Sequence, residues 1–178
     1  RDPQLFDELA SIVTTRQREV ATIEKSGLLG EAQFASELLA FEGKSLISRR
    51  AWRKKWFDNV NKKLAECDVV FADPDNGLCE DNKFSFGQIK SWKRLPLSEA
   101  RTLARGSTAI LYHHNTRRKG GQAREVDYWL EQIGEGTLAL RWRAFSNRTF
   151  FVVNPTGLIA ERLKSFVNAW APEASLHA

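Results

Sequence analysis

Apolar residues recur at helical spacing in the first part of the chain. From Asp2-Pro3, a favourable helix start, hydrophobic side chains follow three or four residues apart as far as Ile23, and only Arg16 interrupts the stripe. Gly27 then offers a stop. The pattern predicts an amphipathic helix between Asp2 and Gly27, and its apolar stripe is more typical of a core-facing surface than of a ligand groove.

A second helical pattern runs from Ser45 to Glu66, after a segment, Gln33 to Phe41, that predicts a short strand. Basic residues dominate the polar side of this helix, where we expect them to be exposed: Arg49, Arg50, Arg53, Lys54, Lys55, Lys62 and Lys63. Such a run is most often a solvated helix face. Because Trp52 and Trp56 lie among these residues, the face also suits contact with nucleic-acid phosphates.

Beyond Glu66, short apolar runs alternate with helical patterns. The predicted elements are a strand Asp68–Ala72, a helix Ser98–Arg105, a strand Thr108–Tyr112, a helix Gln122–Ile133, a hairpin of residues 138–145 and 149–153, and a helix Leu158–Trp170. Strands that alternate with helices form parallel sheets through right-handed crossovers. The expected fold class is therefore α/β, a Rossmann-like open sheet that is mostly parallel and closes with a C-terminal antiparallel hairpin.

Polar side chains follow the first two predicted strands where each strand ends. Asp73-Pro74-Asp75-Asn76-Gly77 follows the first strand, and Tyr112-His113-His114 ends the second. On its own the first stretch indicates a turn, because Asp, Asn, Pro and Gly are the usual turn formers. Since open α/β sheets bind ligands at the carboxyl ends of their strands, the two stretches together predict an active or binding cleft. Adjacent strand residues point to opposite faces, so we expect His113 to join the cleft and His114 to cap the following loop.

Two loops carry further candidate residues. The long polar stretch from Glu80 to Pro96 contains Trp92 among lysines, and a loop of this length is often a lid or a binding loop. The second loop follows the predicted strand Thr108–Tyr112, is basic, and ends in two glycines. The substrate-binding candidates are Tyr112, His114, Arg117, Arg118, Lys119 and Trp92.

Composition narrows the class of protein. The 178 residues, 42% hydrophobic and 28% charged, suffice for one globular domain with a sizeable core. No apolar run reaches the roughly 18 residues that a membrane span needs. Cys67 and Cys79 lack the spacing of a disulfide framework or a zinc site, so we expect reduced thiols and a cytoplasmic protein. The net charge of +5 permits a polyanionic partner. The length predicts a single domain, 1–178. Because the chain has no methionine, we also expect it to lack an N-terminal segment of the full-length protein.

The order of elements from Asp68 onward resembles the second half of class I S-adenosylmethionine-dependent methyltransferases, whose sheet ends in such a hairpin. Members that methylate adenine usually carry Asp-Pro-Pro and an aromatic residue after the fourth strand. Asp73-Pro74 matches that motif, whereas Asp75-Asn76 departs from it and the aromatic that stacks on the flipped base has no counterpart. The segment from Phe151 to Pro155 is similar to a late strand and Asn-Pro turn of bacterial ribosomal-RNA adenine methyltransferases.

A closer resemblance is to an uncharacterised group of bacterial proteins, in which one strand ends in Asp-Pro-Asp-Asn-Gly-Leu and the next in Tyr-His-His with an arginine after it. Asp73 to Leu78, and Tyr112 to His114 with Arg117, look like these two motifs. The methyltransferase resemblance implies S-adenosylmethionine as the cofactor. No GxGxxG-type loop stands in the chain, so we expect the cofactor site in the missing N-terminal segment.

Three functions stay open, with Asp73, Asp75, Asn76 and His113 as the catalytic candidates. In a methyltransferase-like enzyme acting on nucleic acid or a nucleotide, Asp73 would accept a hydrogen bond from the target amino group, and Asn76 or Tyr112 would orient the base. In a divalent-metal-dependent hydrolase or nuclease, Asp73, Asp75 and His113 would hold the ion, and a metal-bound water would attack. The third possibility is a non-catalytic Rossmann-like domain that binds a nucleotide or RNA. The first hypothesis is narrowly preferred.

Overall fold

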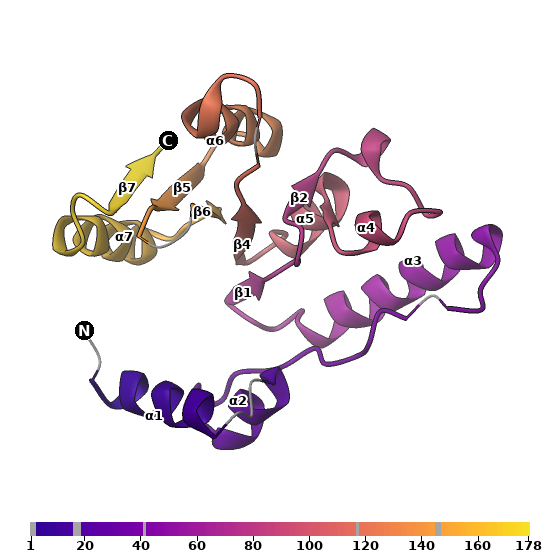
Figure 1. The fold of residues 1–178 in the computed structure, drawn as a ribbon, viewed down its shortest axis with the longest axis horizontal. Helices are drawn as coiled ribbons and strands as arrows, with labels where there is room; N and C mark the ends of the chain where they lie inside the picture. The colour runs from indigo at the N-terminus through magenta and orange to yellow at the C-terminus, as the bar shows by residue number, and fades with distance from the viewer. Residues whose placement is uncertain (1–2, 16–18, 41, 117, 145–146) are drawn as a thin grey trace. The chain divides into compact units, whose positions relative to one another are not determined.

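A computed structural model describes residues 3–15, 19–40, 42–116, 118–144 and 147–178 (Figure 1). The chain divides into two compact units. Unit 1 comprises residues Arg1–Leu38 and unit 2 comprises residues Leu39–Ala178. Unit 2 contains the sheet and every candidate site residue.

Unit 1 is helical. α1 spans Pro3–Thr14 and α2 spans Val20–Ser26, so the single helix predicted here is present as two, with residues 16–18 outside the described ranges. Gly27 ends α2 with a φ of 66°, a left-handed conformation that glycine adopts without steric cost, and this confirms the predicted stop. The strand predicted from Gln33 to Phe41 is not formed over residues 33–40, and Phe41 lies outside the described ranges.

Unit 2 contains the strands and helices predicted between Ser45 and Trp170, with ends that shift by a few residues. Its elements are α3 (Leu46–Lys63), β1 (Val69–Ala72), β2 (Leu78–Cys79), the 3-10 turn η1 (Asp81–Lys83), α4 (Ile89–Trp92), β3 (Leu95–Pro96), α5 (Leu97–Leu103), β4 (Thr108–His114), α6 (Gly121–Ile133), β5 (Thr137–Trp142), β6 (Arg148–Val153), α7 (Gly157–Ala169) and β7 (Ala174–His177). The short parallel pair β2–β3 and the last strand β7 were not predicted.

The main sheet has five strands in the order β1-β4-β6-β5-β7. β1 and β4 run parallel, whereas the β4–β6, β6–β5 and β5–β7 pairs are antiparallel. The fold is therefore α/β with a mixed sheet, and a mostly parallel sheet is not confirmed. The predicted hairpin is present as β5 and β6, but the reversed strand β6 inserts between β4 and β5 instead of adding at an edge. Its run Phe150-Phe151-Val152-Val153 is apolar on both faces, which suits an interior strand.

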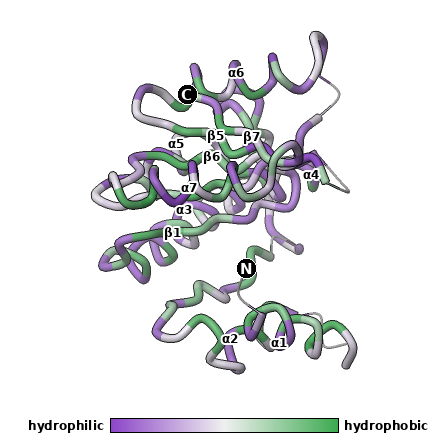
Figure 2. Tube along the Cα trace, turned by 90° about the vertical axis from the view of Figure 1, so that its left-hand side faces the viewer, coloured by the Kyte–Doolittle hydropathy of each residue, from purple (hydrophilic) through white to green (hydrophobic). Residues whose placement is uncertain are grey.

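One face of the sheet carries the core. Ala109 and Leu111 of β4 and Phe151 of β6 are fully buried there, beneath apolar side chains of α3, α5 and α6. In Figure 2 hydrophilic and hydrophobic residues alternate along α6, as expected of a helix that covers a core. α7 packs against Trp142 of β5, with the ring of Phe166 6.0 Å away. Phe71 of β1, by contrast, is 58% exposed.

A buried arginine fixes α3 to the segment before α5. The guanidinium of Arg53 donates two hydrogen bonds to the carboxylate of Glu99, at 2.8 and 2.7 Å, and further ones to the carbonyls of Trp92 and Arg94. Phe84 lies under the same guanidinium, with its ring centroid 4.5 Å away. The sequence places Arg53 on the exposed side of the helix, but the side chain is 4% exposed. That expectation was wrong because this arginine is paired, and pairing is what permits a charge to be buried.

We expect Arg53→Met to lower the free energy of unfolding by about 3 kcal/mol, because it leaves the Glu99 carboxylate and two carbonyls without their donor. Urea denaturation followed by tryptophan fluorescence measures the change. The matched control is Lys54→Met on the same helix, which removes the exposed Lys54–Asp58 pair and should cost less than about 1 kcal/mol. Equal losses in the two variants would argue against an anchoring role for Arg53.

Candidate functional site

His113 joins the turn after β1 to α6. Its place in β4 points the imidazole to the covered face of the sheet, where the residue is 1% exposed. Nδ1 accepts a hydrogen bond from the backbone N–H of Leu78 at 3.1 Å, and Nε2 lies 3.2 Å from Oε1 of Glu125. Because Nδ1 accepts, the proton belongs on Nε2, which donates it to the carboxylate. Both ring nitrogens of His113 are therefore used inside the protein.

Glu125 receives three hydrogen bonds in an almost fully buried position. Besides His113, the backbone N–H and the hydroxyl of Thr116 donate to its carboxylate at 2.8 and 2.6 Å. Burial by itself would raise the pKa of Glu125, but the hydrogen bonds from His113 and Thr116 outweigh burial and hold the pKa below its usual value. The carboxylate is thus charged at neutral pH and satisfied by its neighbours.

Gly77 allows the turn to approach His113 this closely. Its φ of 68° lies in the left-handed region, and a Cβ at this position would stand 2.5 Å from Nδ1 of His113. The glycine of the Asn-Gly pair is therefore required by the close approach of the turn to His113. The structural role of this motif is to bring the turn into contact with His113.

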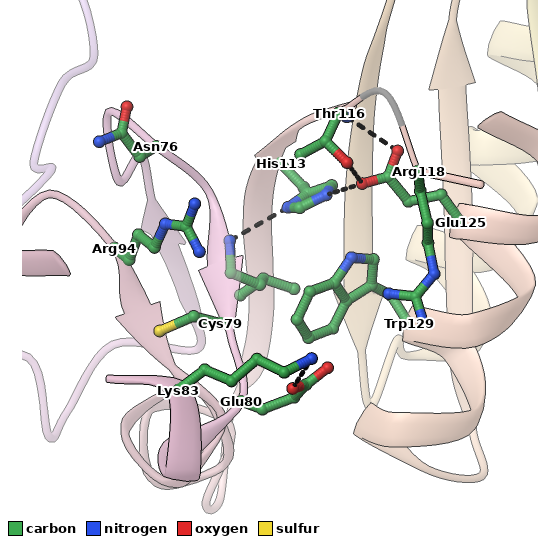
Figure 3. A pocket seen from close by; sticks show the side chains of 11 residues that line it. Asn76, Cys79, Glu80, Lys83, Arg94, His113, Thr116, Arg118, Glu125 and Trp129 are labelled. Atoms are coloured by element: carbon green, nitrogen blue, oxygen red, sulfur yellow. Dashed lines mark hydrogen bonds and ion pairs between the residues drawn. The ribbon is translucent and has the colours of Figure 1, made fainter. Parts of the chain in front are cut away.

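The His113–Glu125 pair forms one wall of a pocket of about 280 Å³ (Figure 3). The pocket lies between the 76–94 segment and α6, at the side where the parallel strands β1 and β4 end. Three cationic side chains and two carboxylates line it: Lys83, Arg94, Arg118, Glu80 and Glu125. Trp129 and Cys79 also line the pocket, together with Asn76, Leu78 and Thr116. The pocket has an excess of positive charge.

Of the predicted catalytic residues, Asn76 and His113 reach this pocket, and Asp73 and Asp75 do not. Asp75 is exposed and pairs with Lys93 at 2.5 Å. Asp73 is an exposed residue at the end of β1. Partial burial of its carboxyl group raises the pKa of Asp73, the charge of Asp75 raises this pKa further, and the charge of Arg148 opposes both effects. The side-chain amide of Asn76 donates to the carbonyl of Lys90 at 3.1 Å, which holds the turn in place.

The predicted substrate-binding residues are divided between different places. Arg118 lines the pocket, whereas Tyr112 and His114 point to the opposite face of β4, where the ring of Tyr112 packs against Phe150. Trp92 is 4% exposed and donates its indole N–H to the carbonyl of Phe86, so it belongs to the core of its segment. Lys119 is exposed in the turn before α6, and Arg117 lies outside the described residues.

The predicted metal ligands Asp73, Asp75 and His113 are not brought together. His113 faces the pocket with both nitrogens occupied, while the two aspartates lie outside it. Within the described part of the chain, no group of three or more His, Cys, Asp or Glu residues is arranged to hold a metal ion. No hydrolytic step follows from these three residues.

The pocket beside His113 does not suit the sulfonium of S-adenosylmethionine, and binding of this cofactor elsewhere stays a prediction. The pocket is lined by Lys83, Arg94 and Arg118, and these cations would repel the positively charged sulfonium of that cofactor.

Cys79 is no nucleophile in this setting, because burial raises the pKa of its thiol to about 11 and the thiol stays protonated.

Sequence reasoning missed Glu125, Arg94, Lys83, Glu80 and Trp129 as pocket residues. Glu125 carried a usable signal, because it stands four residues before Trp129 on the apolar side of α6, where a carboxylate needs a partner. Arg94 and Lys83 sit in an irregular segment whose path no periodicity reveals.

No protein-family model, curated protein or solved structure matches this chain. Among the described helices, none is both long enough and apolar enough to cross a membrane.

Replacing Glu125 by glutamine should lower the free energy of unfolding by about 2 kcal/mol at pH 7, because the donors of His113 and Thr116 lose a charged acceptor. The folded-state pKa of Glu125 is lowered, so its contribution is present above the unfolded value of about 4.3 and is lost as the pH falls through the folded value. The difference between wild type and E125Q should therefore shrink below about pH 4. Urea denaturation at several pH values measures it, and a difference that is constant from pH 7 to pH 3 would count against a charged Glu125.

Gly77→Ala should destabilise the protein more than Gly106→Ala does. Both glycines have a positive φ, but a Cβ at Gly106 meets nothing within 4 Å, whereas one at Gly77 collides with His113. We expect about 1 kcal/mol for G106A from backbone strain alone and about 2 kcal/mol more for G77A. Thermal and urea denaturation give both values, and similar losses would show that the contact with His113 relaxes without cost.

Proposed function

We propose that unit 2 is a nucleic-acid-binding domain that contacts phosphates through α3. The observation that carries this proposal is the distribution of charge. α3 contains seven basic residues and one acidic residue, out of 27 and 22 in the whole chain, so the rest of the chain holds 20 basic and 21 acidic residues. The entire positive excess of the protein therefore lies on one helix, which is the electrostatic footprint of a protein that binds nucleic acid.

The exposed cations form an ordered array along α3. Arg50, Lys54, Asp58 and Lys62 follow one another at intervals of four residues and so form one ridge of the helix. Asp58 is the single acid of α3 and pairs with Lys54. Lys55 and Lys62 are exposed and make no ion pair with any residue that the structure describes. A ridge of this kind can follow a phosphate backbone.

Aromatic rings lie beside these cations. A groove of about 480 Å³ runs between α3 and the 84–99 segment, lined among others by Arg50, Ile47 and Phe86. The guanidinium of Arg50 lies 5.8 Å from the ring centroid of Phe86, and the ammonium of Lys44 lies 5.5 Å from the ring of Trp52. Cations interleaved with aromatic rings are typical of surfaces that bind single-stranded nucleic acid, in which phosphates meet cations and bases stack on rings.

The buried Arg53–Glu99 pair gives this surface a fixed position. Arg53 leaves the exposed face and fastens α3 to the 92–99 segment. The exposed cations of this immobilised helix are Arg50, Lys54, Lys55, Lys62 and Lys63. A preorganised array loses less side-chain and backbone entropy on binding than a flexible basic tail does.

The double variant Lys55→Gln/Lys62→Gln should weaken the binding of a labelled single-stranded RNA of about 20 nucleotides by about tenfold near physiological salt. The slope of log K against log salt concentration should fall by about 1.4, because each lost phosphate contact removes about 0.7. Fluorescence anisotropy at several salt concentrations gives both numbers.

The matched control is Arg162→Gln/Lys164→Gln, which removes two exposed cations from α7 and so changes the net charge equally. This control should change the affinity less than twofold. Equal weakening in both double variants, or no measurable association of the wild type with RNA at low salt, would rule out α3 as a specific interface.

A further inference from the structure

The pocket beside His113 contains a cation that no described residue pairs with. The guanidinium of Arg94 lines the pocket and makes no hydrogen bond or ion pair with any described residue. Its main chain, in contrast, is held, since its N–H donates to the carbonyl of Ser91 at 3.0 Å and its carbonyl accepts from Arg53 at 3.0 Å. Arg94 therefore presents five N–H donors from a fixed backbone position.

The other charges of the pocket do not neutralise Arg94. Glu80 pairs with Lys83 and accepts a hydrogen bond from Tyr128, and Glu125 accepts from His113 and Thr116. Arg118 stacks on Tyr128, with its guanidinium carbon 3.4 Å from the ring centroid. Lys83 balances Glu80, and the two guanidinium groups exceed the charge of Glu125 by one, so the pocket keeps a net positive charge.

Trp129 supplies an independent second observation. The residue is 6% exposed and lines the pocket, and its buried indole N–H has no acceptor among the residues that the structure describes. In Figure 3 the indole lies on the α6 side of the pocket and Arg94 on the opposite side, with Lys83 below them. A buried donor without an acceptor costs free energy, and a bound anion would remove that cost.

We propose that this pocket binds the phosphoryl group of a small phosphomonoester, a site separate from the α3 surface. A phosphoryl dianion offers three terminal oxygens and two negative charges, which suit a pocket that holds the guanidinium of Arg94, the indole N–H of Trp129 and further cations. A carboxylate has two oxygens and a single charge and would satisfy fewer of these donors. The volume of about 280 Å³ is at the lower end for ligand pockets, so the organic part of the ligand is small.

The wall of the pocket is preorganised for this task. The hydrogen bonds of His113 to Leu78 and Glu125 fix the two sides of the pocket, the 76–94 segment and α6, relative to each other. The pairing of Leu78 with Leu95 in the β2–β3 pair fixes the backbone next to Arg94. A fixed backbone around a site of this size favours a ligand of matching charge and geometry.

Isothermal titration calorimetry of the whole chain with inorganic phosphate, adenosine 5′-monophosphate and adenosine tests the proposal. We expect both phosphates to bind and to raise the melting temperature, and adenosine to do neither. Tighter binding of the monophosphate than of inorganic phosphate would identify a nucleotide as the ligand class, and equal binding would identify free phosphate. No heat with either phosphate at about 10 mM, or equal binding of adenosine, would overturn the proposal.

Arg94→Gln should weaken phosphate binding about tenfold or more, because it removes a charged donor. The neighbouring Lys93→Gln removes the same charge outside the pocket and should change binding less than twofold. Trp129→Phe keeps an aromatic ring, removes the N–H donor and should weaken binding several-fold; it also serves as the test if R94Q does not fold. Equal losses in K93Q and R94Q, or full affinity in both pocket variants, would disprove the site.

Discussion

The hydrogen bonds of His113 are the contact on which the rest of unit 2 depends. One ring nitrogen accepts a hydrogen bond from the segment after β1, and the other donates one to α6. A single side chain of β4 therefore joins that segment to the helix that follows β4. The arrangement requires a glycine at position 77 and a charged, buried Glu125. Turn, strand and helix are thus mutually dependent, and the pocket exists because they are joined.

A second buried pair performs a similar task on the other side of the same segment. Arg53 and Glu99 bind α3 to residues 92–99, while His113 and Glu125 bind α6 to residues 77–78. The irregular stretch between β1 and α5 is therefore held by a charged or polar pair at each end. This explains how a segment with little regular structure presents Arg94 and Phe86 at defined positions on two different surfaces.

Local patterns predicted most elements of unit 2, and the errors concern contacts between distant residues. The helical stripe of α6 and the apolar run of β4 are readable because the side chains that define them lie within a few residues of one another. The burial of Arg53 cannot be predicted from local patterns, because its partner Glu99 is 46 residues away in the sequence. The same holds for β6, whose place between β4 and β5 depends on pairing over long distances. Asp73 and His113 were predicted to converge because each stands where a strand ends. They are separated in the structure by the alternation of side chains along β4 and by the turn at Gly77.

The edge position of β1 has a consequence for the solution behaviour of the protein. Val69 and Phe71 are 44% and 58% exposed on an edge strand, a combination that invites pairing with a second chain. Asp68 and Asp73 stand directly before and after this strand, and charges so placed act as gatekeepers against aggregation. Because the pKa of Asp73 is raised, its charge is lost earlier on acidification than that of an ordinary aspartate. The protection that Asp73 gives this edge therefore weakens as the pH falls.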